Sequence, residues 1–288
     1  MARNDVRDAI AQHFLDALNA GTIPWRKPWN AGTGRPRNAV TQRPYRGVNA
    51  FYLGLLQTVR GYPTGEWITL NQTLKAGGRV VYSEFKNSTE VVFWQFVKKE
   101  KTVNGKKVSE TFPLCRSFRV YNRAQCEGLP ASKASAPAEH TPIEAAQRIL
   151  DGMPNRPKML NGENAYYMPA TDSVTVPPLS TFENAESFYS TTFHELAHST
   201  GHKSRLGRDL SMMLEKYSKE ELVAEMAASF LCAEAGIFET VKENSTAYVQ
   251  CWADALGKEP RVIVEAAGLA QKAADYILGT TFPKDEEE

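Results

Sequence analysis

Apolar residues recur at helical spacing in both halves of the chain. Val6, Ile10, Phe14 and Leu18 lie four residues apart and predict a helix that stops at Gly21. Helices are also expected over residues 49–60, from Thr141-Pro142 onward, and over 245–256 and 260–278. The pairs Ser180/Glu183 and Ser218/Glu221 have the spacing of a capping box, and predict helices that run to about residues 201 and 235.

Strand-like segments fill much of the remaining sequence. Residues 67–70, 79–83, 91–98 and 112–122 have strand composition, and Gly77-Gly78 predicts a turn before the second of them. The last two flank a lysine-rich tip with Asn104-Gly105, which predicts a hairpin. A second hairpin is expected from 165–168 and 173–176, and its free edge could hold an extended peptide. Residues 23–47 have the composition of an ordered loop.

A change in composition divides these elements into two groups. Residues 130–142 are small, polar and proline-rich, which is typical of a linker. With 288 residues, of which 42% are hydrophobic, each half can bury a core. We therefore expect two α+β domains, over residues 1–129 and 143–288.

Charge is distributed unevenly between these halves, although the net charge is only +1. Residues 1–135 hold 21 Lys and Arg against 9 Asp and Glu, whereas the rest of the chain holds 13 against 24. A basic half beside an acidic half favours a polyanionic partner for the basic half. The alternative is a dipolar protein whose halves attract each other.

The compartment follows from the cysteines and the N-terminus. Four cysteines occur without any C-x-x-C pair, which is typical of free thiols in a reducing cytosol. The first residues lead into an amphipathic segment rather than a signal peptide, and the apolar run 91–97 is too short to span a bilayer. We expect a cytoplasmic protein without a membrane partner.

The strongest chemical motif is His194-Glu195-Leu196-Ala197-His198. Histidines four residues apart on a helix share one face, so both imidazoles can bind a single Zn²⁺ or another divalent ion such as Mn²⁺. Glu195 is placed to take a proton from a water molecule activated by the ion and to pass it to a leaving amine. The alternative is a chance pair of histidines on a surface helix.

A third ligand is expected from the next helix, because Ser204 stands where one family of such motifs has a third histidine. In E-E-L-V-A-E, Glu221 is the predicted ligand, and Glu225 would accept the N–H of a ligating imidazole. Three alternatives stay open: Glu221 only completes the cap of Ser218, Glu225 is the ligand, or His202 is.

The basic half interleaves aromatic and cationic residues. Unpaired bases stack on aromatic rings while Arg and Lys neutralise phosphates, so this pattern favours single-stranded DNA. The alternative is that the tryptophans are core residues and the arginines are solvated. The candidate DNA-binding residues are Trp25, Arg26, Lys27, Trp29, Arg35, Arg37, Arg43, Tyr45, Arg46, Asn49 and Arg79.

Several of these motifs resemble the ArdC-type antirestriction proteins of mobile elements. The N-terminal resemblance lies in P-W-R-K-P-W at 24–29, Asn38, P-Y-R-G-V-N at 44–49, Trp67 and G-G-R at 77–79. The C-terminal resemblance lies in H-E-L-A-H-S-T-G-H at 194–202, Arg205-Leu206 and E-E-L-V-A-E at 220–225. Residues 83–89, S-E-F-K-N-S-T, depart from the lysine- and glycine-rich turn of that family.

The resemblance implies an N-terminal domain that binds single-stranded DNA and a C-terminal zincin-like metallopeptidase domain. Such a protein would shield incoming plasmid or phage DNA from restriction in the host bacterial cell, with or without cleavage of a host protein. Two other functions stay open. One is a metalloprotease whose basic half docks an acidic protein, and the other is a DNA-binding protein whose metal is purely structural.

Overall fold

The structure is a computed structural model that describes residues 5–26, 35–103, 106–132, 141–211, 217–237 and 246–280. The expected tip at Asn104-Gly105, most of the expected linker, and the predicted DNA-binding residues Lys27 and Trp29 lie outside these ranges. Helices and sheets occur in both halves of the chain, as the α+β prediction requires. No helix in the described ranges is long and apolar enough to cross a membrane.

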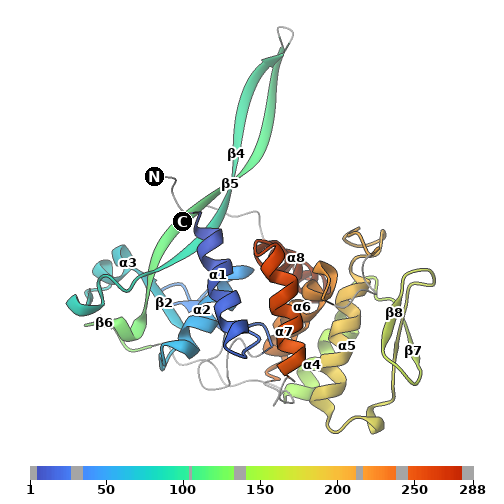
Figure 1. Ribbon diagram of the computed structural model, residues 1–288. Helices are drawn as coiled ribbons and strands as arrows, with labels where there is room; N and C mark the ends of the chain where they lie inside the picture. Colours follow the sequence, from blue (N-terminus) through green and yellow to red (C-terminus); the bar gives the residue numbers. More distant parts are fainter. Residues whose placement is uncertain are drawn as a thin grey trace.

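The N-terminal half combines helices with a sheet in the order β1-β2-β5-β4. Strand β2 pairs antiparallel with the C-terminal end of β5. Strand β4 pairs with β5 along the whole length of β4, so the two long strands form a hairpin that projects from the body (Figure 1). Gly77, at φ 82°, makes the expected turn before a small sheet of β3 and β6. The elements are α1 (Val6–Asn19), β1 (Arg37–Asn38), α2 (Val48–Val59), β2 (Glu66–Thr69), α3 (Leu70–Lys75), β3 (Arg79–Val80), β4 (Thr89–Val103), β5 (Lys106–Asn122) and β6 (Cys126–Glu127), with 3-10 turns at Tyr82–Glu84 and Arg123–Gln125.

The C-terminal half has five helices in its described residues and a three-stranded sheet in the order β7-β9-β8. Strands β8 and β9 form the expected hairpin, while β7 pairs parallel with β9 and was not predicted. The elements are α4 (Pro142–Gly152), β7 (Lys158–Asn161), β8 (Tyr166–Met168), β9 (Ser173–Val176), α5 (Ala185–Ser199), α6 (Lys219–Ala235), α7 (Thr246–Lys258) and α8 (Val262–Ile277), with a 3-10 turn at Leu179–Thr181.

Local capping chemistry explains most helix starts. Thr141 and Glu144 form the reciprocal capping box at α4, and Ser218 caps α6 as predicted. The predicted start of α5 at Ser180 is wrong. Ser180 lies in the 3-10 turn, and Asn184 caps α5 instead by accepting the Ser187 N–H at 2.7 Å.

The hydrophobic core is continuous between the two halves. Helix α1 packs against α7 and α8, and α2 packs against α8. The rings of Phe51 and Phe230, one from each half, have centroids 4.6 Å apart. Helices α5 and α6 pack together, which brings the two segments with candidate metal ligands side by side (Figure 1).

Candidate metal centre

Helix α5 carries the two histidines of the H-E-x-x-H motif on one face. Their Nε2 atoms lie 3.2 Å from each other, and the planes of the two rings are 84° apart. The His198 side chain is 6% exposed and the His194 side chain is 22% exposed. The pair is therefore open to solvent mainly on the His194 side.

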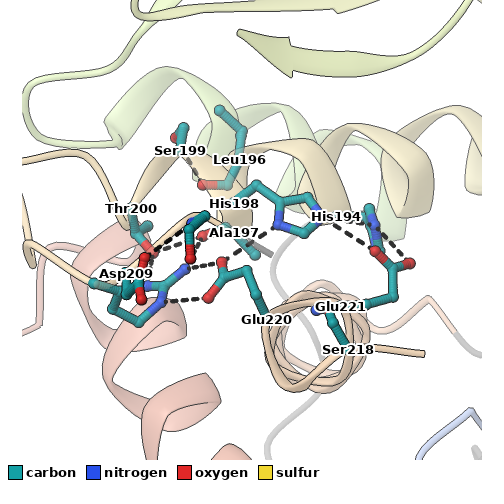
Figure 2. A network of polar contacts seen from close by, with 12 residues as sticks. His194, Leu196, Ala197, His198, Ser199, Thr200, Asp209, Ser218, Glu220 and Glu221 are labelled. Atoms are coloured by element: carbon teal, nitrogen blue, oxygen red, sulfur yellow. Dashed lines mark hydrogen bonds and ion pairs between the residues drawn. The ribbon is translucent and has the colours of Figure 1, made fainter. Parts of the chain in front are cut away.

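The first turn of α6 supplies a carboxylate to this pair. The Ser218 hydroxyl accepts the backbone N–H of Glu221 at 3.1 Å, which fixes where the helix begins. The Glu221 side chain does not fold back over the cap but faces the histidines (Figure 2). Its two oxygens lie 3.4 Å from His194 Nε2 and 3.5 Å from His198 Nε2.

The spacing of these three donor groups suits a small divalent cation. Their closest donor atoms are 3.2 to 3.5 Å apart, and in a tetrahedral site with bonds of about 2.0–2.1 Å two ligand atoms lie about 3.3 Å apart. Among the described residues, His194, His198 and Glu221 are the group that could hold a metal ion. Two histidines with one glutamate are also the donor set of many hydrolytic zinc sites.

Glu195 lies beside this cluster and is 9% exposed. Burial raises the pKa of its carboxyl above the ordinary value, while the neighbouring His194 and His198 act in the opposite direction. A hydrogen bond from the backbone of Tyr167, in β8, also stabilises the carboxylate. The carboxyl is therefore held between the histidine pair and the edge strand β8.

The prediction that Glu225 supports a ligating imidazole is wrong, because Glu220 takes this position. His198 Nδ1 donates to Glu220 Oε1 at 3.3 Å (Figure 2). Arg208 holds the same carboxylate from the other side, with 2.7 Å from Nη2 to Oε1 and 3.1 Å from Nε to Oε2. Burial raises the pKa of Glu220, but the hydrogen bonds from His198 and Arg208 outweigh it and leave the pKa below its ordinary value.

The protonation of His198 depends on these carboxylates. Burial lowers its pKa, but the hydrogen bonds with Glu220 and Glu221 and the charge of Glu195 raise it to about 9. Glu220 and Glu221 are adjacent in sequence, so successive positions on α6 present carboxylates to the two ring nitrogens of one histidine. The sequence signal for two carboxylates around His198 was the pair Glu220-Glu221, but the sequence does not indicate which glutamate faces which ring nitrogen.

A second network ties the hairpin of β8 and β9 to the end of α5. The Arg205 side chain is fully buried and binds the Asp172 carboxylate in the hairpin turn and the Ser199 carbonyl at 2.8 Å. The Tyr167 hydroxyl donates to the same Asp172 at 3.0 Å. This network fixes β8, and with it the Tyr167 backbone, relative to Glu195.

Trp25 is not on the surface, and the prediction that its ring stacks on bases is wrong. It is 0% exposed, packs edge-on against Trp252 with centroids 5.4 Å apart, and donates from Nε1 to Glu225 at 2.7 Å. Arg26 pairs with the same Glu225 at 3.3 Å and lies over the Tyr248 ring. Glu225 therefore joins the two halves of the chain, and the apolar Ile23, two residues before Trp25, was too weak a sequence signal to indicate this burial.

Other candidate DNA-binding residues also connect the halves. Arg35 donates to Gln271 at 2.7 Å, and burial lowers its pKa to about 10. Arg46 pairs with Asp275, and the Gly47 N–H donates to Gln271 at 3.1 Å. These contacts place Arg35 and Arg46 against α8, and DNA binding by these two residues stays a prediction.

The remaining described candidates differ in exposure. Asn49 is partly buried and binds both backbone groups of Val92, at 2.6 and 3.0 Å, and so joins α2 to β4. Tyr45 and Arg37 are partly buried. Arg43 and Arg79 are exposed, and Arg79 pairs with Glu127 at 2.8 Å.

His202 lies past the end of α5. Its Nδ1 is 2.7 Å from the Ser204 hydroxyl, within its own loop. The group of possible metal ligands in the described residues does not include it.

Comparison with known proteins gives the same two-part organisation. Residues 4–121 match the family model of the N-terminal domain of the anti-restriction factor ArdC, and residues 144–269 match that of a zincin-like metallopeptidase. The chain is 34% identical to DNA primase TraC of Escherichia coli over 94% of its own length. It spans only 20% of that primase and 27% of a second TraC.

Two solved structures cover the whole architecture. The metal-free crystal structure of the antirestriction protein ArdC from the R388 plasmid is 32% identical, with a TM-score of 0.74 over 95% of this chain and 96% of that one. The Mn(II)-bound structure of the same protein gives a TM-score of 0.75 over 96% and 97%, respectively. These matches run through both halves in order, and the chain belongs to the ArdC family of antirestriction proteins.

Proposed function

We propose that this protein protects incoming mobile-element DNA from restriction, binds single-stranded DNA through its N-terminal half, and hydrolyses a peptide bond at a metal site in its C-terminal half. His194, His198 and Glu221 would hold the cation, zinc or manganese, and Glu195 would act as the general base. The observation that carries the proposal is the arrangement of three donor groups at tetrahedral spacing beside a buried carboxyl.

The residues around the cluster have separate tasks in this chemistry. A divalent cation, when bound, would polarise a substrate carbonyl and make a water molecule acidic. Glu195 would take the proton from that water and deliver it to the leaving amine, and its raised pKa suits a group that must both accept and release a proton. Glu220 would keep the Nδ1 proton of His198 in place, so that Nε2 presents its lone pair to the cation.

Two features favour a catalytic site over a structural metal. Structural zinc sites use four protein ligands, whereas hydrolytic sites use three and keep one position open. The described residues offer three, and His194 and Glu221 remain 22% and 26% exposed. The edge strand β8, with Tyr166 and Met168 exposed, could pair with an extended peptide next to Glu195.

Two observations support single-stranded DNA as the partner of the N-terminal half: its positive charge and the family to which the chain belongs. Residues 1–135 hold a net charge of +12 from 21 basic and 9 acidic side chains, and phosphate neutralisation dominates the affinity of nucleic-acid binding. The similarity to DNA primases supports a DNA partner for the same half.

Metal content and activity of matched variants test the catalytic part. We expect Glu221→Ala to lose metal, and Glu195→Gln to keep it while losing hydrolysis of unstructured polypeptides. Glu186→Gln, in the first turn of the same helix, is the control and should keep both. Full metal affinity in Glu221→Ala would contradict the ligand set.

Restriction of unmodified DNA entering a host tests the biological part. Cells that express the protein should take up such DNA more efficiently than cells without it. If Glu195→Gln protects the DNA as well as the wild type does, hydrolysis is not needed for protection. Loss of protection in Glu195→Gln, with metal and DNA binding intact, would support a host protein as the substrate.

A further inference from the structure

The outer part of the β4–β5 hairpin is a two-stranded ribbon. Strand β2 pairs with β5 only at Val120–Asn122, so the residues of β5 that precede Val120 pair with β4 alone. Figure 1 shows this ribbon extending away from the helices. An isolated two-stranded ribbon is marginally stable in water, so its exposed side chains need a function other than core formation.

The two faces of the ribbon differ. Residues directly opposite each other in an antiparallel pair point to the same side, so Val91 and Phe118, Phe93 and Arg116, and Gln95 and Leu114 share one face. Trp94 is on the other face, where the Arg7 guanidinium lies 5.7 Å from its ring centroid, beside α1.

The first face exposes large apolar side chains. Phe118 is 45% and Leu114 is 44% exposed, although both are residues that ordinarily fill a core. The Phe93 and Phe118 rings meet edge to face, with centroids 6.1 Å apart, and Arg116 is exposed directly opposite Phe93. We call Phe93, Leu114, Arg116 and Phe118 the ribbon face.

The charge of the hairpin selects an anionic partner for this face. Residues 89–122 hold seven Lys or Arg against three Glu, a net charge of +4. Aromatic rings beside cations suit unpaired bases on a phosphate backbone. The bases of a duplex are already stacked on each other, and so they offer no free ring face to Phe93 or Phe118.

The geometry of the strand fits the same partner. Leu114, Arg116 and Phe118 follow each other at two-residue steps along β5, which places them about 6.8 Å apart. That step is about twice the rise per base of ~3.4 Å along one stacked DNA strand, so every second base can lie against successive side chains of this face.

We propose that the ribbon face is the surface on which single-stranded DNA bases stack, in place of the buried Trp25. This inference rests on the proposed single-stranded DNA binding and locates it. The aromatic rings supply stacking, Arg116 neutralises a phosphate, and the net positive charge of residues 89–122 attracts the DNA backbone.

Fluorescence anisotropy of the full chain with a labelled oligothymidine of about 20 bases tests the proposal. The double variant Phe93→Ala/Phe118→Ala should weaken binding at least about tenfold, because each lost stack removes a base contact. Phe93→Tyr/Phe118→Tyr keeps both rings and should stay within about twofold of wild type. Thermal melting shows whether each variant is folded.

Two controls test whether DNA binding depends on this face of the ribbon, and not on the charge of β5 or on any exposed aromatic ring. Arg116→Ala and Arg119→Ala remove the same charge from the same strand, but Arg119 points to the opposite face and pairs with Glu90 at 3.4 Å. Arg116→Ala should therefore weaken binding more. Tyr82→Ala removes a ring that is 96% exposed outside the ribbon and should leave affinity unchanged.

The outcomes distinguish this inference from the proposed function. If the wild type binds no oligothymidine at low salt, the proposed single-stranded DNA binding fails. If the wild type binds and the Phe93→Ala/Phe118→Ala variant binds equally well, the DNA lies elsewhere and only this inference fails. Tighter binding to a duplex of the same length, lost in the same variant, would make the ribbon a duplex-binding arm and would also overturn it.

Discussion

Glu220 offers the sharpest test of how the metal centre is organised. Replacement by glutamine keeps the size of the side chain but removes its charge. The carboxylate of Glu220 accepts from His198 Nδ1 on one side and from two nitrogens of Arg208 on the other. A glutamine amide keeps one acceptor oxygen, which can take the place of Oε1, but its NH₂ group would then stand where Oε2 accepts from Arg208 Nε and would set donor against donor.

The expected effect on the metal is large and local. Loss of the carboxylate that orients a ligating histidine typically lowers metal affinity by 10- to 100-fold, or about 1.4–2.7 kcal/mol. Folding should suffer too, because the side chains of Arg208 and Glu220 are only 7% and 6% exposed. An Arg208 cation left with a neutral partner should cost about 3 kcal/mol of unfolding free energy in the metal-free protein.

Competition with a chromophoric chelator measures the metal affinity, and urea unfolding of the metal-free protein measures the stability. Glu234→Gln is the matched control, since Glu234 is an exposed glutamate near the other end of α6. A Glu220→Gln variant that binds Zn²⁺ or Mn²⁺ within about twofold of wild type would refute the role assigned to Glu220. Equal losses in Glu220→Gln and Glu234→Gln would attribute the effect to the charge of α6 as a whole.

Three further predictions concern residues whose surroundings the structure defines. Trp25→Ala should lower the unfolding free energy in urea by about 3–5 kcal/mol, because it leaves a cavity and leaves Glu225 without its indole donor. Trp25→Phe also removes the donor but fills more of the cavity, so it should cost less. A loss of DNA affinity at unchanged stability would contradict this. Asn49→Ala should cost about 1–3 kcal/mol by unpairing the Val92 backbone, and a thermal melt equal to wild type would rule this out. Metal affinity should rise about tenfold per pH unit as the pH increases toward 9, because the cation must displace the His198 proton, whose pKa is about 9. A metal affinity that stays constant between pH 6 and 8, measured with a competing chelator, would exclude displacement of this proton.

Short-range chemistry was readable from the sequence alone. The helix pattern of α1, the capping residues Thr141 and Ser218, and the hairpin of β8 and β9 depend on interactions within a few residues. The pairing of His194 with His198 belongs to the same class, because four residues on a helix place them on one face whatever the rest of the chain does.

Contacts between distant segments were not readable in this way. Trp25 and Glu225 are 200 residues apart, and nothing near Trp25 indicates that an α6 carboxylate receives its indole N–H. A loop rich in Trp, Arg and Pro has the composition of a DNA-binding surface and also that of an interface between two halves of a chain. The buried position of Trp25 distinguishes the two, and burial is a property of the packed molecule.

The metal centre combines both kinds of information. The sequence by itself indicated that His194, Glu195 and His198 share one helix and that carboxylates begin the next. Only the packing of α5 against α6 decided that Glu221 faces the open side of the histidine pair, that Glu220 meets His198 Nδ1, and that Glu225 turns to the other half of the chain. The physical reason is that helical periodicity sets directions around one axis, whereas the meeting of two side chains depends on how two axes are placed, which the whole core determines.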